Sequence, residues 1–248
     1  MKRLVACIAL LAMATGASAQ DRDGPPEGGG ADGGADGGLR RGAAYANPSA
    51  LIAAEIALQR QAREKGQWQA YRENAAVGAV LLAPEPVPAE PWLKDRAEPA
   101  ALPNWQPHAV WMSCDGGYGA VEGGWTEPGS SGLYAAIWQR QENGGYKWLI
   151  RQRIGRDRPV TAPDMLSASV ADCEQRGREA DNRQPLRARK GKPLPPAVNA
   201  QTGYSEDRTL YWRTGKDADG TPWLQVAIRK EGAMRIVLGD ALGPLAGN

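Results

Sequence analysis

The sequence is poor in the residues that build metal and nucleotide sites. Its 248 residues include no phenylalanine, one histidine and three cysteines. The lone His108 and the scattered cysteines cannot supply the clustered nitrogen and sulfur ligands of a zinc site. The Gly-x-Ser-x-Gly, P-loop and dinucleotide-binding motifs are also missing from the sequence. We therefore expect no metal, no cofactor and none of the enzyme classes that these motifs mark.

Long apolar runs are missing as well. The opening MKRLVACIALLAMATGASA has a basic start, a short apolar core and a small-x-small end. This pattern is typical of a secretory signal peptide, and its apolar core is shorter than the about 20 residues that span a bilayer. We expect cleavage after Ala19, which gives a periplasmic or secreted protein without a transmembrane anchor.

The expected mature chain has almost no net charge. Loss of Lys2 and Arg3 with residues 1–19 lowers the 30 basic residues to 28, equal to the 28 acidic residues. A neutral surface provides no long-range attraction to nucleic acid or anionic membranes, so we expect no nucleic-acid partner. Residues 20–46 are rich in glycine and contain little to bury, which predicts a flexible linker.

Two cysteines, Cys114 and Cys173, remain after Cys7 leaves with the signal peptide. An even number of cysteines in an oxidising compartment favours a single disulfide bond. Two buried free thiols are the alternative.

A long amphipathic helix is predicted to open the folded part of the chain. Asn47 can cap its start and Gly66 can end it. The apolar stripe of this helix contains Leu51 and Leu58, and Glu55 projects from inside the stripe. A carboxylate in that position either finds a partner or lines a cavity.

The next segment predicts two short helices around a short strand. Trp68 and Tyr71 lie on the first short helix, residues 79–83 form the strand, and Trp92 lies on the second helix. The alternating prolines within residues 84–88 are expected to prevent regular structure between them.

From Trp105 onward the apolar residues alternate with a period of two, which predicts an antiparallel meander. Its strands are expected within residues 105–113, 118–126, 132–141 and 146–153. The alternation places Trp105 and Trp111 on one face, and Trp148 on one face with Ile150. Helices followed by this meander indicate an α+β domain over residues 47–155. Residues 156–248 are expected to form a loop-rich extension, with about three short strands that extend or cover the sheet.

These elements, in this order, resemble the NTF2-like superfamily (the cystatin-like cone), and within it the SnoaL/DUF4440-type bacterial proteins. The segments that carry the resemblance are GQWQAYRENAAVGAVLLAPEP, AEPWLKDR and GLYAAIWQRQENGGYKWLIRQR. The sequence departs from the family at Val77-Gly78, where an acidic pair is usual. The resemblance implies three N-terminal helices on a curved antiparallel sheet, with a pocket for a small apolar molecule between the long helix and the sheet.

The resemblance leaves three functions open. The first is binding of a small apolar molecule in a pocket lined by Glu55, Leu58, Trp68, Tyr71, Trp92, Trp111, Trp125 and Trp138. The second is a ketosteroid-isomerase or SnoaL-type isomerase, dehydratase or cyclase, in which Glu55 takes a proton and Tyr71 or His108 polarises a carbonyl. The third is a non-catalytic interaction protein that forms a homodimer through its sheet.

Both polar candidates also have a purely structural interpretation. Glu55 can pair with an arginine such as Arg96, Arg140 or Arg151. His108 can be a histidine whose hydrogen bonds are satisfied within the fold.

Overall fold

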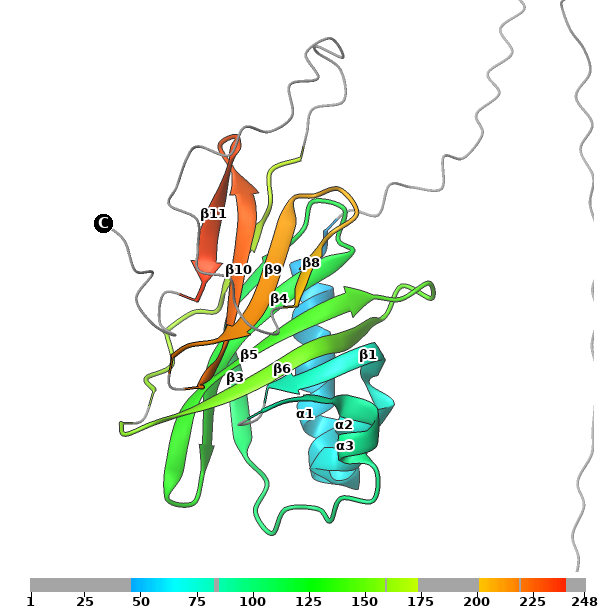
Figure 1. The fold of residues 1–248 in the computed structure, drawn as a ribbon, viewed down its shortest axis with the longest axis vertical. Helices are drawn as coiled ribbons and strands as arrows, with labels where there is room; N and C mark the ends of the chain where they lie inside the picture. Colours follow the sequence, from blue (N-terminus) through cyan, green and yellow to red (C-terminus); the bar gives the residue numbers. More distant parts are fainter. Residues whose placement is uncertain (1–45, 83–84, 159, 174–200, 219, 240–248) are drawn as a thin grey trace, which may run out of the picture. The chain divides into compact units, whose positions relative to one another are not determined.

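The computed structural model describes residues 46–82, 85–158, 160–173, 201–218 and 220–239 (Figure 1). The signal peptide and nearly all of the linker expected from the sequence lie outside these described residues. In the part of the chain that is described, no helix is long and apolar enough to span a bilayer.

The described residues form a sheet-dominated structure with few helices, in agreement with the expected α+β class. The helices are α1 (Pro48–Lys65), α2 (Gln67–Glu73) and α3 (Ala89–Leu93). The strands are β1 (Ala75–Leu82), β2 (Pro86–Pro88), β3 (Asn104–Met112), β4 (Tyr118–Glu127), β5 (Ser130–Arg140), β6 (Tyr146–Arg156), β7 (Ser167–Val170), β8 (Thr202–Tyr204), β9 (Leu210–Lys216), β10 (Pro222–Lys230) and β11 (Ala233–Leu238).

Seven strands form the first sheet, in the order β2-β1-β6-β5-β4-β3-β7. The meander from β3 to β6 is antiparallel, whereas β1 joins β6 and β7 joins β3 in parallel. The prediction of irregular structure around the prolines is wrong for β2, which pairs with β1 at the edge of the sheet. An edge strand tolerates proline because the N–H that proline lacks can belong to the unpaired side.

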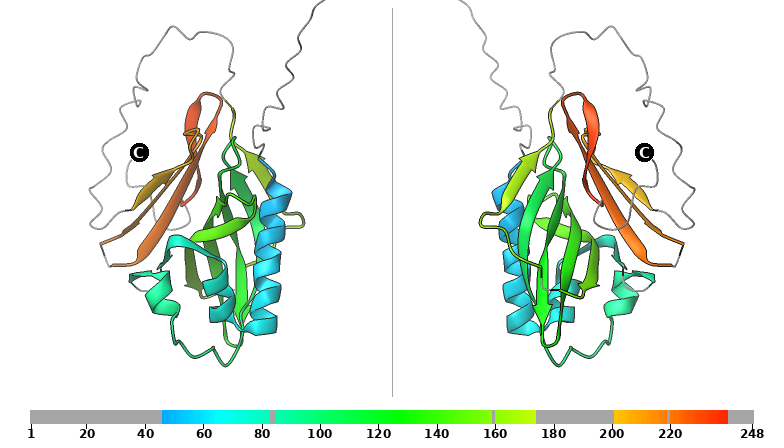
Figure 2. Two further views of the ribbon diagram at one scale, coloured as in Figure 1. Left: turned by 90° about the vertical axis from the view of Figure 1, so that its right-hand side faces the viewer. Right: turned by 90° about the vertical axis from the view of Figure 1, so that its left-hand side faces the viewer.

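Helix α1 packs on one face of the first sheet, here called the inner face (Figure 2). The Asn47 side chain caps the helix by accepting a hydrogen bond from the N–H of Ala50 at 3.3 Å. Gly66 ends the helix with φ 101°, a conformation that L side chains rarely adopt. The side chains of Leu51, Glu55 and Leu58 are buried beneath the helix.

A β-bulge corrects the expected faces of β3. The pairing of β3 with β4 shifts register between Pro107 and Ala109. An extra residue in one strand exchanges the faces of all residues beyond it. Trp105 and Met112 therefore share the inner core, and Trp111 packs on the opposite, outer face.

The C-terminal strands form a separate four-stranded antiparallel sheet, in the order β11-β10-β9-β8. Residues 156–248 were expected to contain about three short strands, and their described part contains five, β7 to β11. The second sheet covers the outer face of the first sheet without extending it (Figure 2). Apolar residues of both sheets form one shared core: Val80, Leu82, Ala120, Ala135, Ile137 and Ile150 from the first, and Leu210, Trp212, Leu224, Val226, Ile228 and Leu238 from the second.

The disulfide between Cys114 and Cys173 lies where the two sheets meet. Its Cα atoms are 5.2 Å apart. The N–H of Cys114 donates to Thr209 Oγ1 at 2.8 Å, and Asp172, beside Cys173, accepts from Lys230 Nζ at 3.1 Å. The disulfide thus connects two segments that each bind the second sheet.

Replacing both cysteines, Cys114→Ser with Cys173→Ser, should lower the free energy of unfolding by about 4 kcal/mol. The bond closes a loop with a sequence separation of 59 residues, so it removes much conformational freedom from the unfolded chain. Urea denaturation of the variant and of the oxidised wild type measures the difference, and reduced wild type should match the variant. Equal denaturation midpoints for all three samples would contradict this expectation.

Candidate functional site

Glu55 lies in the middle of the core between α1 and the first sheet. Its side chain is 0% exposed and that of Arg151 is 5% exposed. Glu55 Oε1 accepts from Arg151 Nη2 at 2.9 Å and from Trp105 Nε1 at 2.8 Å. Glu55 Oε2 accepts from Trp138 Nε1 at 2.9 Å and from Arg151 Nη1 at 3.3 Å. Four donors from β3, β5 and β6 therefore occupy the carboxylate.

Arg151 is held as a cation by this arrangement. Burial by itself lowers the pKa of Arg151, but the charge and hydrogen bonds of Glu55 together with the neighbouring Tyr71 and Tyr134 outweigh burial and raise that pKa above its usual value. Aromatic rings surround the guanidinium at 5.0 to 6.0 Å, namely those of Tyr71, Trp105, Tyr134 and Trp138. Such rings stabilise a cation electrostatically through their negative faces.

The geometry leaves Glu55 without the free lone pair that a general base needs. A carboxylate has about four acceptor positions, and four donors fill them. Arg151 was one of the three arginines considered as a structural partner of Glu55, and the structure identifies it as that partner.

Tyr71 and His108 are not brought together as a catalytic pair with Glu55. The ring of Tyr71 lies in the inner core, and its backbone carbonyl accepts from Trp148 Nε1 at 3.0 Å. His108 lies at the β3 bulge beside Gly124, and partial burial lowers the pKa of its imidazole. Neither residue is among the four donors to Glu55.

Most residues of the expected pocket lie in the inner core, and one does not. Those in or against this core are Leu58, Trp68, Tyr71, Trp92, Trp125 and Trp138. Trp111 lies on the outer face because of the bulge in β3. The remaining aromatic side chains fill the expected pocket by packing on one another, as Trp68 does on Trp92 at 5.3 Å between ring centroids.

A small cavity of about 10 Å³ remains at one end of the inner core. Its walls are Tyr71, Pro103, Trp105, Trp125, Tyr134, Arg151 and Arg153. The Tyr134 hydroxyl is buried there without a hydrogen-bond partner. Burial, and then the negative charge of Glu55, raise the pKa of Tyr134 well above its usual value, so this hydroxyl remains a donor.

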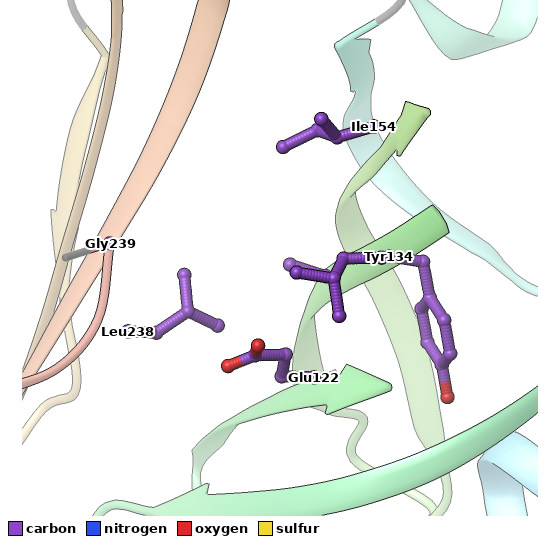
Figure 3. Close-up of a pocket in the computed structure, with 7 residues that line it drawn as sticks. Glu122, Tyr134, Ile154, Leu238 and Gly239 are labelled. Atoms are coloured by element: carbon purple, nitrogen blue, oxygen red, sulfur yellow. The ribbon is translucent and has the colours of Figure 1, made fainter. Parts of the chain in front are cut away.

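A second cavity, of about 20 Å³, lies between the two sheets (Figure 3). Glu122 of β4 and Leu238 of β11 face each other across it, and the ring of Tyr134 points to the other side of its strand (Figure 3). Burial raises the pKa of Glu122, and the charge of Arg156 offsets part of that effect. Each cavity has room for about one water molecule.

Sequence reasoning did not identify Tyr134 and Arg153 as site residues. Tyr134 lies four residues before Trp138 in one strand, so the period-two pattern contained the signal that places its ring in the inner core beside Trp138. Arg151 was harder to place, because a register shift lies between Trp148 and Ile150 of β6. Trp148 and Ile150, which were expected on one face, consequently lie on opposite faces of the sheet.

Among the described residues, no group of three or more histidine, cysteine, aspartate or glutamate side chains could hold a metal ion. The buried charged residues Glu55 and Arg151 instead form an ion pair, and the indoles of Trp105 and Trp138 donate to its carboxylate.

Solved structures that are similar to this chain include the following two. One is a candidate ketosteroid isomerase from Kribbella flavida DSM 17836, with 11% identity and a TM-score of 0.33 over 48% of this chain and 86% of its own. The other is an NTF2-like protein of unknown function from Burkholderia xenovorans LB400, with 17% identity and a TM-score of 0.31 over 47% of this chain and 91% of its own. No protein-family model and no curated protein matches the chain.

The variant Glu55→Gln should lower the free energy of unfolding by about 3–5 kcal/mol, since it leaves the buried Arg151 cation without its counter-charge. In glutamine an NH2 group replaces one of the two carboxylate oxygens. This donor would face an indole or guanidinium donor where the wild type has an acceptor. Urea denaturation at neutral pH tests the loss. A variant with wild-type stability would instead favour a general base that has no structural role.

The variant Glu122→Gln is the matched control, and its stability relative to wild type should rise with pH. Because the folded pKa of Glu122 is raised, its protonated form is favoured in the folded state, and that stability is lost as pH rises above the ordinary value of 4.5. A glutamine side chain cannot ionise, so the variant should gain stability relative to wild type as pH rises from 4.5 to 7. Melting temperatures across this range provide the comparison, and parallel curves would count against a raised pKa.

Proposed function

We propose that the chain is an exported NTF2-like protein of the SnoaL/DUF4440 type that binds a small molecule without transforming it. The order of α1, α2, β1, α3 and the β3–β6 meander supports the superfamily assignment. The Cys114–Cys173 disulfide is compatible with an oxidising, periplasmic or extracellular location.

The unpartnered Tyr134 hydroxyl is the observation that carries the binding proposal. A buried donor without an acceptor costs about 1–3 kcal/mol, so a bound acceptor at this position would remove an existing penalty. The hydroxyl belongs to a cavity whose other walls are mainly aromatic and include two arginines. Gly123 helps to create this environment, because a Cβ at that position would collide with the Tyr134 ring.

The cavity chemistry refines the expected class of ligand. The aromatic walls suit a flat apolar body, and the Tyr134 hydroxyl and the arginines suit a carbonyl or carboxylate at one end. We therefore propose a small planar molecule with one acceptor or anionic group, in place of a wholly apolar molecule.

The cavity in its present form has room for about one water molecule, so binding of such a molecule requires the side chain of Arg153 to move and enlarge it. Arg153 stacks on the Trp125 ring at 3.8 Å and pairs with Glu127 at 3.1 Å, and it is partly exposed. A partly exposed ion pair is worth only about 1 kcal/mol or less, so this wall of the cavity can open at small cost. The buried ion pair of Glu55 and Arg151, by contrast, keeps its position on the inner side of the cavity.

The enzyme alternative lacks its base in this arrangement. Glu55 is occupied by four donors, and His108 lies at the β3 bulge away from that cluster. Binding without catalysis requires neither residue to accept a proton.

The variant Tyr134→Phe should weaken ligand binding about tenfold without loss of fold stability. One hydrogen bond to a charged acceptor is worth about 1.5–3 kcal/mol, and about 1.4 kcal/mol corresponds to a factor of ten. Benzoate is a suitable probe, with its affinity measured by titration while the indole N–H signals are followed by NMR. Native mass spectrometry of the purified wild type would show any molecule retained from the cell.

The variant Tyr146→Phe serves as control, since the Tyr146 hydroxyl already donates to the Gly116 carbonyl at 2.8 Å. This variant should lose about 1 kcal/mol of stability and bind benzoate as the wild type does. If wild type neither retains a molecule nor responds to benzoate, the binding proposal is wrong.

A further inference from the structure

Two turns in the chain share one sequence pattern and one set of hydrogen bonds. They are Ser113–Tyr118, SCDGGY, between β3 and β4, and Ser205–Leu210, SEDRTL, between β8 and β9. In each turn the serine hydroxyl donates to the aspartate two residues later, at 2.5 and 2.6 Å. The serine N–H donates to the carbonyl five residues later, at 2.9 Å in both. The fourth residue is left-handed in both turns, Gly116 with φ 67° and Arg208 with φ 59°.

The strands on either side of these turns also pair in one register. When the two turns are aligned residue by residue, Ala120 of β4 is equivalent to Trp212 of β9. Their partners on the next strand are Ile137 and Val226. Their partners on the preceding strand are Trp111 and Gly203. The meander β8–β11 therefore repeats the pairing of β3–β6 with shorter strands.

A β-bulge occurs at the same position in both meanders. Between β5 and β6 the register shifts after the pair Ile137–Ile150, and between β10 and β11 it shifts after the pair Val226–Leu238. These two pairs are equivalent in the alignment of the turns. Bulges are specific features of a fold that persist within families, so a bulge at equivalent positions is a stronger match than a shared strand count.

The equivalent residues lie in one shared core. The equivalent pairs are Ala120 with Trp212, Ala135 with Leu224, Ile137 with Val226, and Ile150 with Leu238. All eight residues belong to the core between the sheets. The same face of each meander is therefore the buried face.

The two turns bind each other reciprocally. The N–H of Asp115 donates to Asp207 Oδ2 at 2.7 Å, and the N–H of Asp207 donates to Asp115 Oδ2 at 3.2 Å. A contact in which residue i meets residue j, and j meets i, is the mark of a two-fold, isologous interface. Here both halves of the interface belong to one chain.

From these observations we infer that β8–β11 is a shortened second copy of the β3–β6 meander, and that the outer face of the first sheet is a self-recognition surface. The chain occupies this surface with its own second copy. Trp212 supplies bulk where its equivalent, Ala120, is small, so the two copies have become complementary in shape. The partner that this surface fits is the same meander from a second chain, once the internal copy is released.

Release can be tested in the full mature chain by removing the bonds at the junction of the sheets. The variant combines Cys114→Ser and Cys173→Ser with Asp207→Ala, which deletes the bond from the Asp115 N–H to the Asp207 carboxylate, one half of the reciprocal turn contact. We expect wild type to sediment at the mass of one chain and the variant to double its mass with rising concentration. In a mixture of isotopically labelled and unlabelled variant, native mass spectrometry should show mixed dimers, because the second copies exchange between chains.

The control carries the same cysteine substitutions with Asp164→Ala, at an exposed position outside both sheets, and should remain at the mass of one chain. Should Asp207→Ala prevent folding, Asp207→Asn in the same background provides a milder loss of the contact. A folded release variant that stays at the mass of one chain at every concentration would overturn self-recognition. A wild type that is already dimeric would overturn occupation of the surface by its own copy.

Discussion

The ion pair between Glu55 and Arg151 fixes the relative positions of four elements at a single buried point. Glu55 comes from α1, Arg151 from β6, and the indole donors from β3 and β5. In a low-dielectric interior each of these charges is tolerated only when its hydrogen bonds are complete. The helix therefore cannot slide or rotate on the sheet without exposing an unpaired charge, and the arrangement selects one packing of α1 among many apolar alternatives.

A second constraint acts on the other side of the sheet and is independent of the ion pair. The outer face is covered by the second sheet through apolar residues, and polar bonds are concentrated near the Cys114–Cys173 disulfide. The strands of the β3–β6 meander thus have a core on both faces. This explains why the meander contains buried side chains at successive positions, such as Ala135, Ala136 and Ile137, where a one-sided sheet would alternate.

Much of the fold could be read from the sequence, and the errors in the faces of strand residues share one cause. The long helix ends at Gly66 as its capping pattern indicates, and the two cysteines pair as their number suggests. Glu55 inside an apolar stripe correctly signalled a partner or a cavity, but the pattern could not choose between them. The faces of Trp111 and Ile150 were wrong because each lies beyond a bulge. A bulge inserts one residue without a distinctive side chain, so strict alternation cannot reveal it.

The absence of phenylalanine from the sequence is consistent with an inner core whose aromatic side chains also donate hydrogen bonds. Five tryptophans among the described residues donate their indole N–H: Trp105 and Trp138 to Glu55, and Trp68, Trp125 and Trp148 to backbone carbonyls. Phenylalanine would supply similar apolar area but no donor. In this core, replacing Trp105, Trp138 or Trp148 by phenylalanine would leave a buried acceptor one bond short. The aromatic residues of this protein therefore act both as the filling of the core and as the donors that make its central charge tolerable.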